Sequence, residues 1–249
     1  MANPMRIEPN QLLLLLSWMS PGFPTGSFAY SHGLEWAIEN GTVATAGDLT
    51  SWIEDLLTRG SGWNDAVLFA RCWRDDADEL NELALALASS KERWLETTQL
   101  GRAFGIAASV FLSCHPRVYP GDPSLSSSHP LSLGTMGRRN KSGDDRSERD
   151  DVAYPVVAGT ACRAAGMEKF HALLAFLQGF LNALISVAVR LVPLGQTQGL
   201  EVLRDLMPVI AAVAERAALA SLDDLGSMTI ASDIASMKHE TLHSRVFRT

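Results

Sequence analysis

The clearest candidates for chemistry in this sequence are two histidines near its C-terminal end. His239, Glu240 and His243 form the pattern H-E-x-x-H. On a helix this spacing places two imidazoles on one face, where they bind zinc while the glutamate acts as a general base. A catalytic zinc needs a third protein ligand, and the residues after His243 include no histidine, cysteine, aspartate or glutamate. A zinc-dependent hydrolase is therefore kept as the alternative, and a partner-binding tail is the favoured interpretation.

Other side chains with chemical potential are isolated. His32 and Glu35 lie three residues apart and can share a helix face, but one such pair does not make an active site. Cys114 and His115 are adjacent, which is poor evidence for a metal site. No P-loop, G-x-G-x-x-G or G-x-S-x-G motif occurs. The sequence predicts no catalytic residues and no cofactor or metal site, which favours an interaction protein over an enzyme.

The composition narrows the class further. Of 249 residues, 47% are hydrophobic and 20% are charged, which suits a soluble protein with a sizeable core. The net charge of −7 disfavours nucleic acid as a partner. Three scattered cysteines without a C-x-x-C pair indicate buried thiols in a reducing compartment. We expect a cytoplasmic protein, because the apolar N-terminal run has a single arginine before it and no clean cleavage site after it.

The elements that must position these residues are helices. Leu49, Ile53, Leu56 and Leu57 repeat with helical period, and Thr45 with Asp48 resembles a capping box before them. A second helix follows, with Asn64 or Asp65 as its predicted cap, and others are expected over residues 79–88 and 91–112. Sustained strand patterns are absent from the sequence. The predicted fold class is therefore all-α, a helical bundle.

The N-terminal stretch 12–36 combines an apolar helix, a turn and a second helical piece. Two prolines and two glycines within residues 21–26 specify that turn tightly. The second helical piece is predicted over residues 29–36. An ordered apolar turn of this kind requires packing, either on the core or on a partner. Its candidate contact residues are Phe23, Phe28, Tyr30, His32 and Glu35.

The second half holds an insertion and a long central helix. Residues 116–151 are rich in Ser, Gly, Pro and charge, which predicts a flexible loop between helices. Residues 168–192 form an apolar helix long enough for a membrane span, but a polar row runs along it: Gln178, Asn182, Ser186 and Arg190. Such a row favours the buried helix of a soluble bundle over a membrane partner. The row either forms core hydrogen bonds or lines a water-filled path.

A further helix is expected over residues 198–220. Pro208 lies inside it and should kink the helix or mark its restart. The tail, residues 222–249, is less periodic, acidic first and basic last.

Three blocks together resemble one family, the UreF urease accessory proteins. SPGFPTGSFAYSHGLEWAIENG resembles its N-terminal signature, RLVPLGQTQG its central block, and DDLGSMTIASDIASMKHETLHSRVFRT its C-terminal block. Order and spacing also agree over nearly the whole chain apart from the insertion. The chain departs from the family at Ala153, where a histidine often precedes Tyr-Pro, and at His243, where an aromatic residue is common. The second departure creates H-E-x-x-H by accident.

The resemblance implies a non-enzymatic helical chaperone for urease maturation, one UreF-like domain over residues 1–249. Such proteins bridge UreD (also called UreH) and the nickel-carrying GTPase UreG on apo-urease, and they dimerise. Nickel is handled by the complex, and a path for it is thought to run through the interior shared by UreF and UreD. The polar row of the long helix is the candidate lining of that path. The tail is implied to dock on UreD/UreH, with these candidate contacts: Lys238, His239, Glu240, Ser244, Arg245, Phe247 and Arg248.

Overall fold

A computed structural model describes residues 7–112, 151–192 and 194–248. These residues form helices and short 3-10 turns with no strand among them, which confirms the all-α prediction. The elements are α1 (Pro9–Trp18), η1 (Ser27–Ala29), α2 (Leu34–Glu39), α3 (Ala46–Arg59), α4 (Ser61–Arg71), α5 (Ala77–Ala86), α6 (Lys91–Leu112), α7 (Tyr154–Ala164), α8 (Lys169–Leu191), α9 (Gln196–Leu219), η4 (Leu222–Asp224) and α10 (Ile230–His239).

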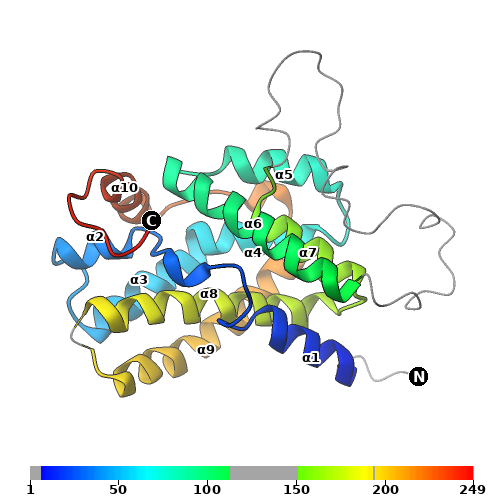
Figure 1. The fold of residues 1–249 in the computed structure, drawn as a ribbon, viewed down its shortest axis with the longest axis horizontal. Helices are drawn as coiled ribbons and strands as arrows, with labels where there is room; N and C mark the ends of the chain where they lie inside the picture. Colours follow the sequence, from blue (N-terminus) through cyan, green and yellow to red (C-terminus); the bar gives the residue numbers. More distant parts are fainter. Residues whose placement is uncertain (1–6, 113–150, 193, 249) are drawn as a thin grey trace, which may run out of the picture.

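The long apolar helix α8 lies at the centre of the bundle. It packs against α9, α4, α2 and α7, and α1 crosses one end of it (Figure 1). Leu173, Leu177, Leu181 and Leu184 are fully buried in the main hydrophobic cluster, which draws on every helix from α1 to α9 except α5. By length and composition alone α8 is also apolar enough to cross a membrane. Its packing against these neighbours instead matches the predicted central helix of a bundle.

Local signals placed several helix ends correctly. Thr45 and Asp48 form the predicted capping box at the start of α3: the Asp48 amide donates to Thr45 Oγ1 (3.2 Å) and the Thr45 amide to Asp48 Oδ2 (2.9 Å). Helix α6 has the predicted bounds. Cys72 and Cys162 are buried free thiols, as expected, whereas Cys114 lies outside the described residues.

Two local predictions were wrong, and one of two alternatives is excluded at a third position. Helix α4 begins at Ser61, so Asn64 and Asp65 lie inside it and cannot cap it; Asn64 Oδ1 instead accepts from the Gly226 amide at 2.9 Å. Helix α9 runs without a break through Pro208, so no restart occurs there, and the kink stays a prediction. The second helical piece of the N-terminal stretch begins at Leu34, because His32 and Gly33 take left-handed conformations (φ 52° and 75°) that end any helix before it.

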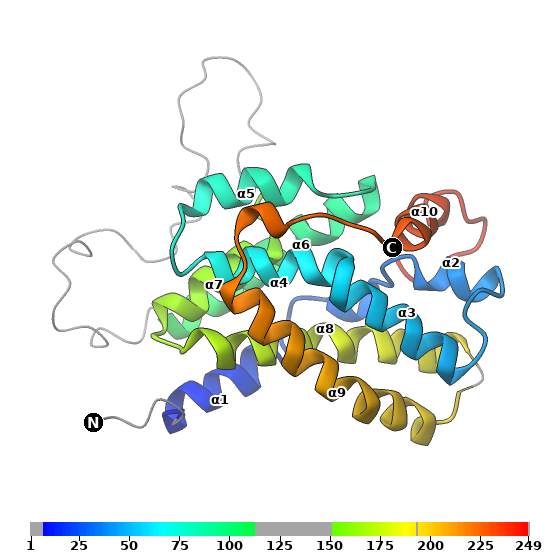
Figure 2. The same ribbon diagram turned by 180° about the vertical axis from the view of Figure 1, so that it is seen from behind.

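The tail and the N-terminal stretch meet at one end of the bundle. In both views α10 lies beside α2, with the C-terminal residues between them and η1 (Figures 1 and 2). At Gly33 the backbones approach so closely that a Cβ would stand 2.6 Å from the Ser236 amide nitrogen. Glycine is therefore required at this position for two reasons: its φ is positive, and a side chain has no space there.

The predicted insertion, residues 116–151, lies outside the described residues except for Asp151. The Asp151 carbonyl accepts a hydrogen bond from Asn81 Nδ2 at 2.9 Å, and the Asn81 Oδ1 accepts from the Ala153 amide at 2.7 Å. These bonds join the start of α7 to α5.

Candidate functional site

The tail is attached to the body by an ionic cluster, which we call the tail cluster: the buried Glu35, Glu92 and His239 and the exposed Arg245. His239, the last residue of α10, is 0% exposed. Its Nδ1 lies 2.7 Å from Glu92 Oε2 on α6, and its Nε2 lies 2.9 Å from Glu35 Oε2 on α2. Arg245 donates to the other oxygen of Glu92 at 2.7 Å. One histidine therefore joins three helices that are remote in the sequence.

The backbone of the tail adds to the same cluster. Glu35 accepts hydrogen bonds from the amides of Val246 (2.7 Å) and Phe247 (2.9 Å). The Arg248 amide donates to the Ala29 carbonyl at 2.7 Å, and the Phe247 side chain is buried. The tail, which the family resemblance implies to dock on UreD/UreH, packs here on its own chain. Its weak periodicity reflects anchoring by a few polar contacts rather than by an apolar stripe.

The H-E-x-x-H geometry of a zinc site is not formed. Both nitrogens of His239 already face carboxylates, and His243 lies exposed beyond the end of α10. Glu240 accepts from the Lys91 amide at 3.0 Å, across from the start of α6. Within the described ranges no group of three or more His, Cys, Asp or Glu side chains is placed to hold a metal ion. The motif therefore serves tail attachment, because its first histidine is a structural residue.

A second buried ionic cluster, the pocket-floor cluster, consists of His32, Asp65, Arg93 and Glu96. His32 Nε2 lies 2.8 Å from Glu96 Oε1, and Arg93 Nη1 lies 2.6 Å from Glu96 Oε2. Arg93 also approaches Asp65 at 3.5 Å. The His32 ring meets the Phe180 ring on α8 edge-on, with centroids 4.8 Å apart.

Burial and charge act in opposite directions in the pocket-floor cluster. Burial disfavours the ionised form of Glu96, but Arg93 and His32 outweigh that cost and lower its pKa to about 2. Burial dominates at Asp65 and raises its pKa despite the nearby Arg93. Burial also opposes the charge of Arg93, yet Glu96 and Asp65 raise the pKa of its guanidinium. Glu96 and Arg93 therefore form the ionised centre of this cluster.

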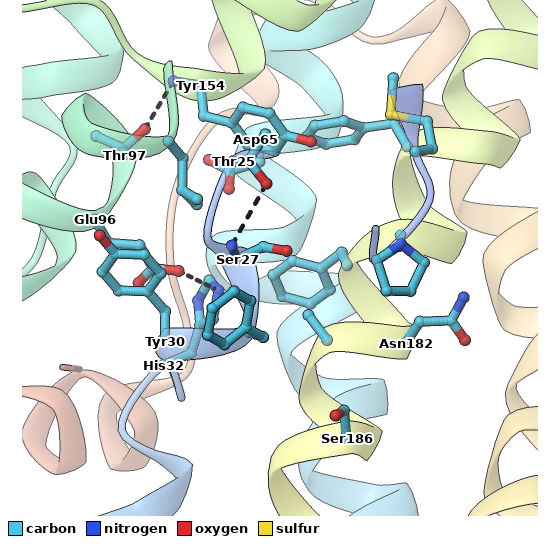
Figure 3. A pocket seen from close by; sticks show the side chains of 18 of the residues that line it. Thr25, Ser27, Tyr30, His32, Asp65, Glu96, Thr97, Tyr154, Asn182 and Ser186 are labelled. Carbon is cyan, nitrogen blue, oxygen red and sulfur yellow. Dashed lines mark hydrogen bonds and ion pairs between the residues drawn. The ribbon is translucent and has the colours of Figure 1, made fainter. Parts of the chain in front are cut away.

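A cavity of about 140 Å³ opens above the pocket-floor cluster (Figure 3). The N-terminal stretch, α6 and α8 enclose it, and aromatic residues form much of its wall. Of the predicted contact residues, Phe28, Tyr30 and His32 line this cavity. Phe23 packs on Phe104 in the core instead, with ring centroids 5.4 Å apart, and Glu35 belongs to the tail cluster.

The polar row of α8 is divided between different surroundings. Asn182 and Ser186 line the cavity. Gln178 Nε2 donates to Asn182 Oδ1 at 3.4 Å, and Arg190 is exposed near the end of the helix. Half of the row thus borders an internal space, which leaves the path interpretation untested.

Sequence reasoning missed the partners that α6 supplies. Glu92, Arg93 and Glu96 are all buried, although a charged E-R-x-x-E run normally marks a solvent-exposed helix face. Their spacing places Glu92 and Glu96 on one face of the helix. In the sequence, only two histidines outside α6 indicated that buried carboxylates are required as their partners. Asp65 was singled out as a cap and lies in the floor of the cavity instead.

Apolar side chains are exposed on the outer face of α10. Its inner face, including Ala235 and Ser236, is buried against the body. Ile230, Ile234 and Met237 lie on the opposite face and are 70%, 45% and 49% exposed. Their spacing of four and three residues forms one stripe, which we call the α10 stripe. A stripe of this kind on an anchored helix has the character of a protein-binding surface.

Comparison with known proteins gives consistent matches. The UreF family model matches residues 43–207. The chain is 41% identical over 252 residues to the urease accessory protein UreF of Brucella ovis, covering 99% of this chain and 98% of that protein. It is 38% identical over 244 residues to UreF of Ruegeria pomeroyi (96% and 97% covered) and 41% identical over 244 residues to UreF of Methylorubrum populi (95% and 98%). These alignments extend over the N-terminal stretch and the tail, which lie outside the matched model.

Proposed function

This chain belongs to the UreF family of urease accessory proteins, and from that premise we propose that it bridges UreD/UreH and the GTPase UreG on apo-urease. As a UreF it is a non-enzymatic accessory protein involved in urease maturation. The bridging role, cytoplasmic residence, and the handling of nickel by the assembled complex belong to the proposal. One domain over residues 1–249 is proposed as well, supported by a main core that draws on every helix from α1 to α9 except α5.

The observation that carries the proposal is the anchored tail. The tail cluster holds α10 against α2 and α6, so the α10 stripe faces outward on a fixed support. Pre-ordering a helix lowers the entropy that is lost when a partner binds it. We assign the stripe, together with the exposed Lys238, Ser244 and Arg248, to UreD/UreH. His239 and Phe247, also predicted contacts, act from inside by positioning this surface.

Charge substitution on the stripe tests the UreD/UreH assignment. Ile234→Glu with Met237→Glu places two carboxylates on the stripe without touching the buried face of α10. We expect loss of co-purification with UreD/UreH and an unchanged far-UV circular dichroism spectrum. Leu200→Glu with Met207→Glu, two exposed apolar residues of α9, is the matched control and should still co-purify. Retention of UreD/UreH by the α10 variant would contradict the assignment.

The bridging role is tested by reconstitution. The chain, UreD/UreH and UreG are co-expressed, and their complex is followed by size-exclusion chromatography and urease activation. We expect UreG to elute with UreD/UreH only when the chain is present. Co-elution of the two without it would refute the bridge.

A nickel path along α8 remains a proposal, supported by the two row residues that line the cavity. Asn182→Leu with Ser186→Ala makes that wall apolar and should reduce urease activation by nickel. Gln178→Leu is the control, because it removes the same Gln178–Asn182 hydrogen bond while leaving Asn182 in the wall. Normal activation by a folded double variant would exclude this lining.

We also propose a homodimer, supported by apolar residues exposed where α1 meets the end of α6. The Trp18 and Phe111 rings pack there with their centroids 6.2 Å apart, and Leu13 and Leu16, on the same helix as Trp18, are 61% and 63% exposed. Leu13→Glu with Leu16→Glu should convert a dimer to a monomer in light scattering. A wild-type chain that is monomeric at high concentration would overturn this proposal.

A further inference from the structure

We propose that the cavity above the pocket-floor cluster binds a small methylated ammonium cation, with Asp65 as its counter-ion and the aromatic wall as its cage. The binding is a property of the isolated chain. It goes beyond the proposed role in urease maturation and does not depend on it.

The floor of the cavity carries one negative charge in excess. Arg93 Nη1 lies 2.6 Å from Glu96 Oε2, so these two charges compensate each other. Asp65 lies 3.5 Å from Arg93, and this is its one ion pair among the described residues. With His32 neutral, two carboxylates therefore share a single guanidinium. A ligand that enters this space is attracted when it is a cation and repelled when it is an anion.

Asp65 is the group of the floor that lacks a close partner. Its side chain is 18% exposed, and it borders both this cavity and a second one of about 40 Å³. Burial raises the pKa of Asp65, because the nearby Arg93 does not offset the loss of water around the carboxylate. A buried charge is costly until an opposite charge accompanies it. Asp65 therefore supplies a counter-ion that the chain itself pairs incompletely.

Aromatic residues supply much of the wall around Asp65 (Figure 3). They come from the N-terminal stretch, α7 and α8: Trp18, Phe28, Tyr30, Tyr154, Phe176 and Phe180. The faces of such rings attract cations, and aromatic cages recognise methylated ammonium groups in this way. The volume of about 140 Å³ is smaller than that of pockets for drug-sized ligands, so the cavity suits a compact ion.

The cavity suits a methylated ammonium better than an unmethylated one. A primary ammonium has three N–H donors that need acceptors. The Thr97 hydroxyl oxygen already accepts from the Tyr154 amide at 3.0 Å. The two oxygens of Glu96 already face His32 and Arg93, at 2.8 and 2.6 Å. Methyl groups need no acceptor, and they bury apolar surface against the rings.

A titration of the isolated full chain, followed by two-dimensional NMR, tests the proposal. The probe is tetramethylammonium chloride, and tert-butanol is its neutral counterpart of similar size. Asp65→Asn removes the charge of the counter-ion while keeping the size of the side chain. Asp205→Asn, at an exposed position of α9, is the matched control. Phe28→Leu removes one ring of the wall, and the core stays intact because Phe28 is 56% exposed.

We expect tetramethylammonium to bind at one site that saturates at about millimolar concentrations, and to shift the amide signals of Thr97 and Ala183 in the cavity wall. Asp65→Asn should weaken binding roughly ten- to a hundredfold, because it removes a partly buried counter-ion. Phe28→Leu should weaken it about two- to fivefold, the contribution of one cation–π contact at an exposed site. On the wild type, tert-butanol should bind about tenfold more weakly or less, since it carries no charge. Asp205→Asn should match the wild type.

Three results would overturn the proposal: no saturable binding to the wild type, tert-butanol binding as tightly as tetramethylammonium, or unchanged affinity in Asp65→Asn. The raised pKa of Asp65 means that its ionised form disfavours the folded state near neutral pH, so the asparagine variant should fold. Far-UV circular dichroism checks this. If the variant nevertheless unfolds, the comparison of the two probes on the wild type decides, and signal shifts confined to residues outside the cavity would equally refute the site.

Discussion

Glu96→Gln tests whether the pocket-floor cluster stabilises the fold. The carboxylate of Glu96 is fully buried and joins His32 to Arg93 at 2.8 and 2.6 Å. The drop of its pKa from the ordinary 4.5 to about 2 corresponds to roughly 3 kcal/mol of stability near neutral pH. Removing one partner of a buried ion pair costs about 3–5 kcal/mol, so the two estimates agree. We therefore expect the variant to lose roughly 3 kcal/mol of unfolding free energy at neutral pH.

The sign of the pH dependence is set by the depressed pKa. The stabilisation from Glu96 is fully present above the unfolded pKa and is lost as pH falls through the folded pKa. Between these values it shrinks, to about 2 kcal/mol at about pH 3.5. The difference in stability between the wild type and Glu96→Gln should therefore narrow in acid.

Urea unfolding followed by far-UV circular dichroism measures both effects. Glu54→Gln is the control, because Glu54 is exposed on α3, and it should change stability by less than about 0.5 kcal/mol. If Glu96→Gln matched this control at neutral pH, or if its deficit grew in acid, the assignment of Glu96 as an ionised buried centre would be refuted.

Three further substitutions probe the fold. Gly33→Ala should lower protection of the tail amides in hydrogen exchange, because its Cβ meets the Ser236 amide nitrogen. The control, Gly41→Ala, lies at φ 76° in open space and should cost only the left-handed penalty of about 1–2 kcal/mol; equal tail protection in both variants would count against the close approach. Phe104→Ala should cost about 3–5 kcal/mol in urea unfolding, since its ring is fully buried, and a loss below about 1 kcal/mol would contradict its place in the core. Thr45→Ala should lower the free energy of unfolding by about 1 kcal/mol in the same assay, whereas Thr45→Ser, which keeps the capping hydroxyl, should change it little. Equal losses of stability in the two variants would argue against the cap.

Features that depend on neighbours in the sequence were predictable. The capping box at Thr45 and Asp48, the bounds of α6 and the all-α class depend on contacts within a few residues, which periodicity and capping patterns record. The start of α2 was missed because two successive left-handed residues, His32 and Gly33, interrupt a sequence that looks helical. A histidine rarely takes the left-handed conformation. Here the next residue, Gly33, lies directly against the backbone of α10.

The sequence by itself determined the family, through three blocks of residues, and the helical class, through short-range periodicity. Only the tertiary structure decided what the histidines do. His239 meets a carboxylate 204 residues away at Glu35 and another 147 residues away at Glu92. No local pattern encodes such a meeting, because it exists only once α2, α6 and α10 are packed together. The same packing turns a metal-like H-E-x-x-H motif into an anchor for the tail, since burial between two carboxylates leaves neither ring nitrogen of His239 for a metal.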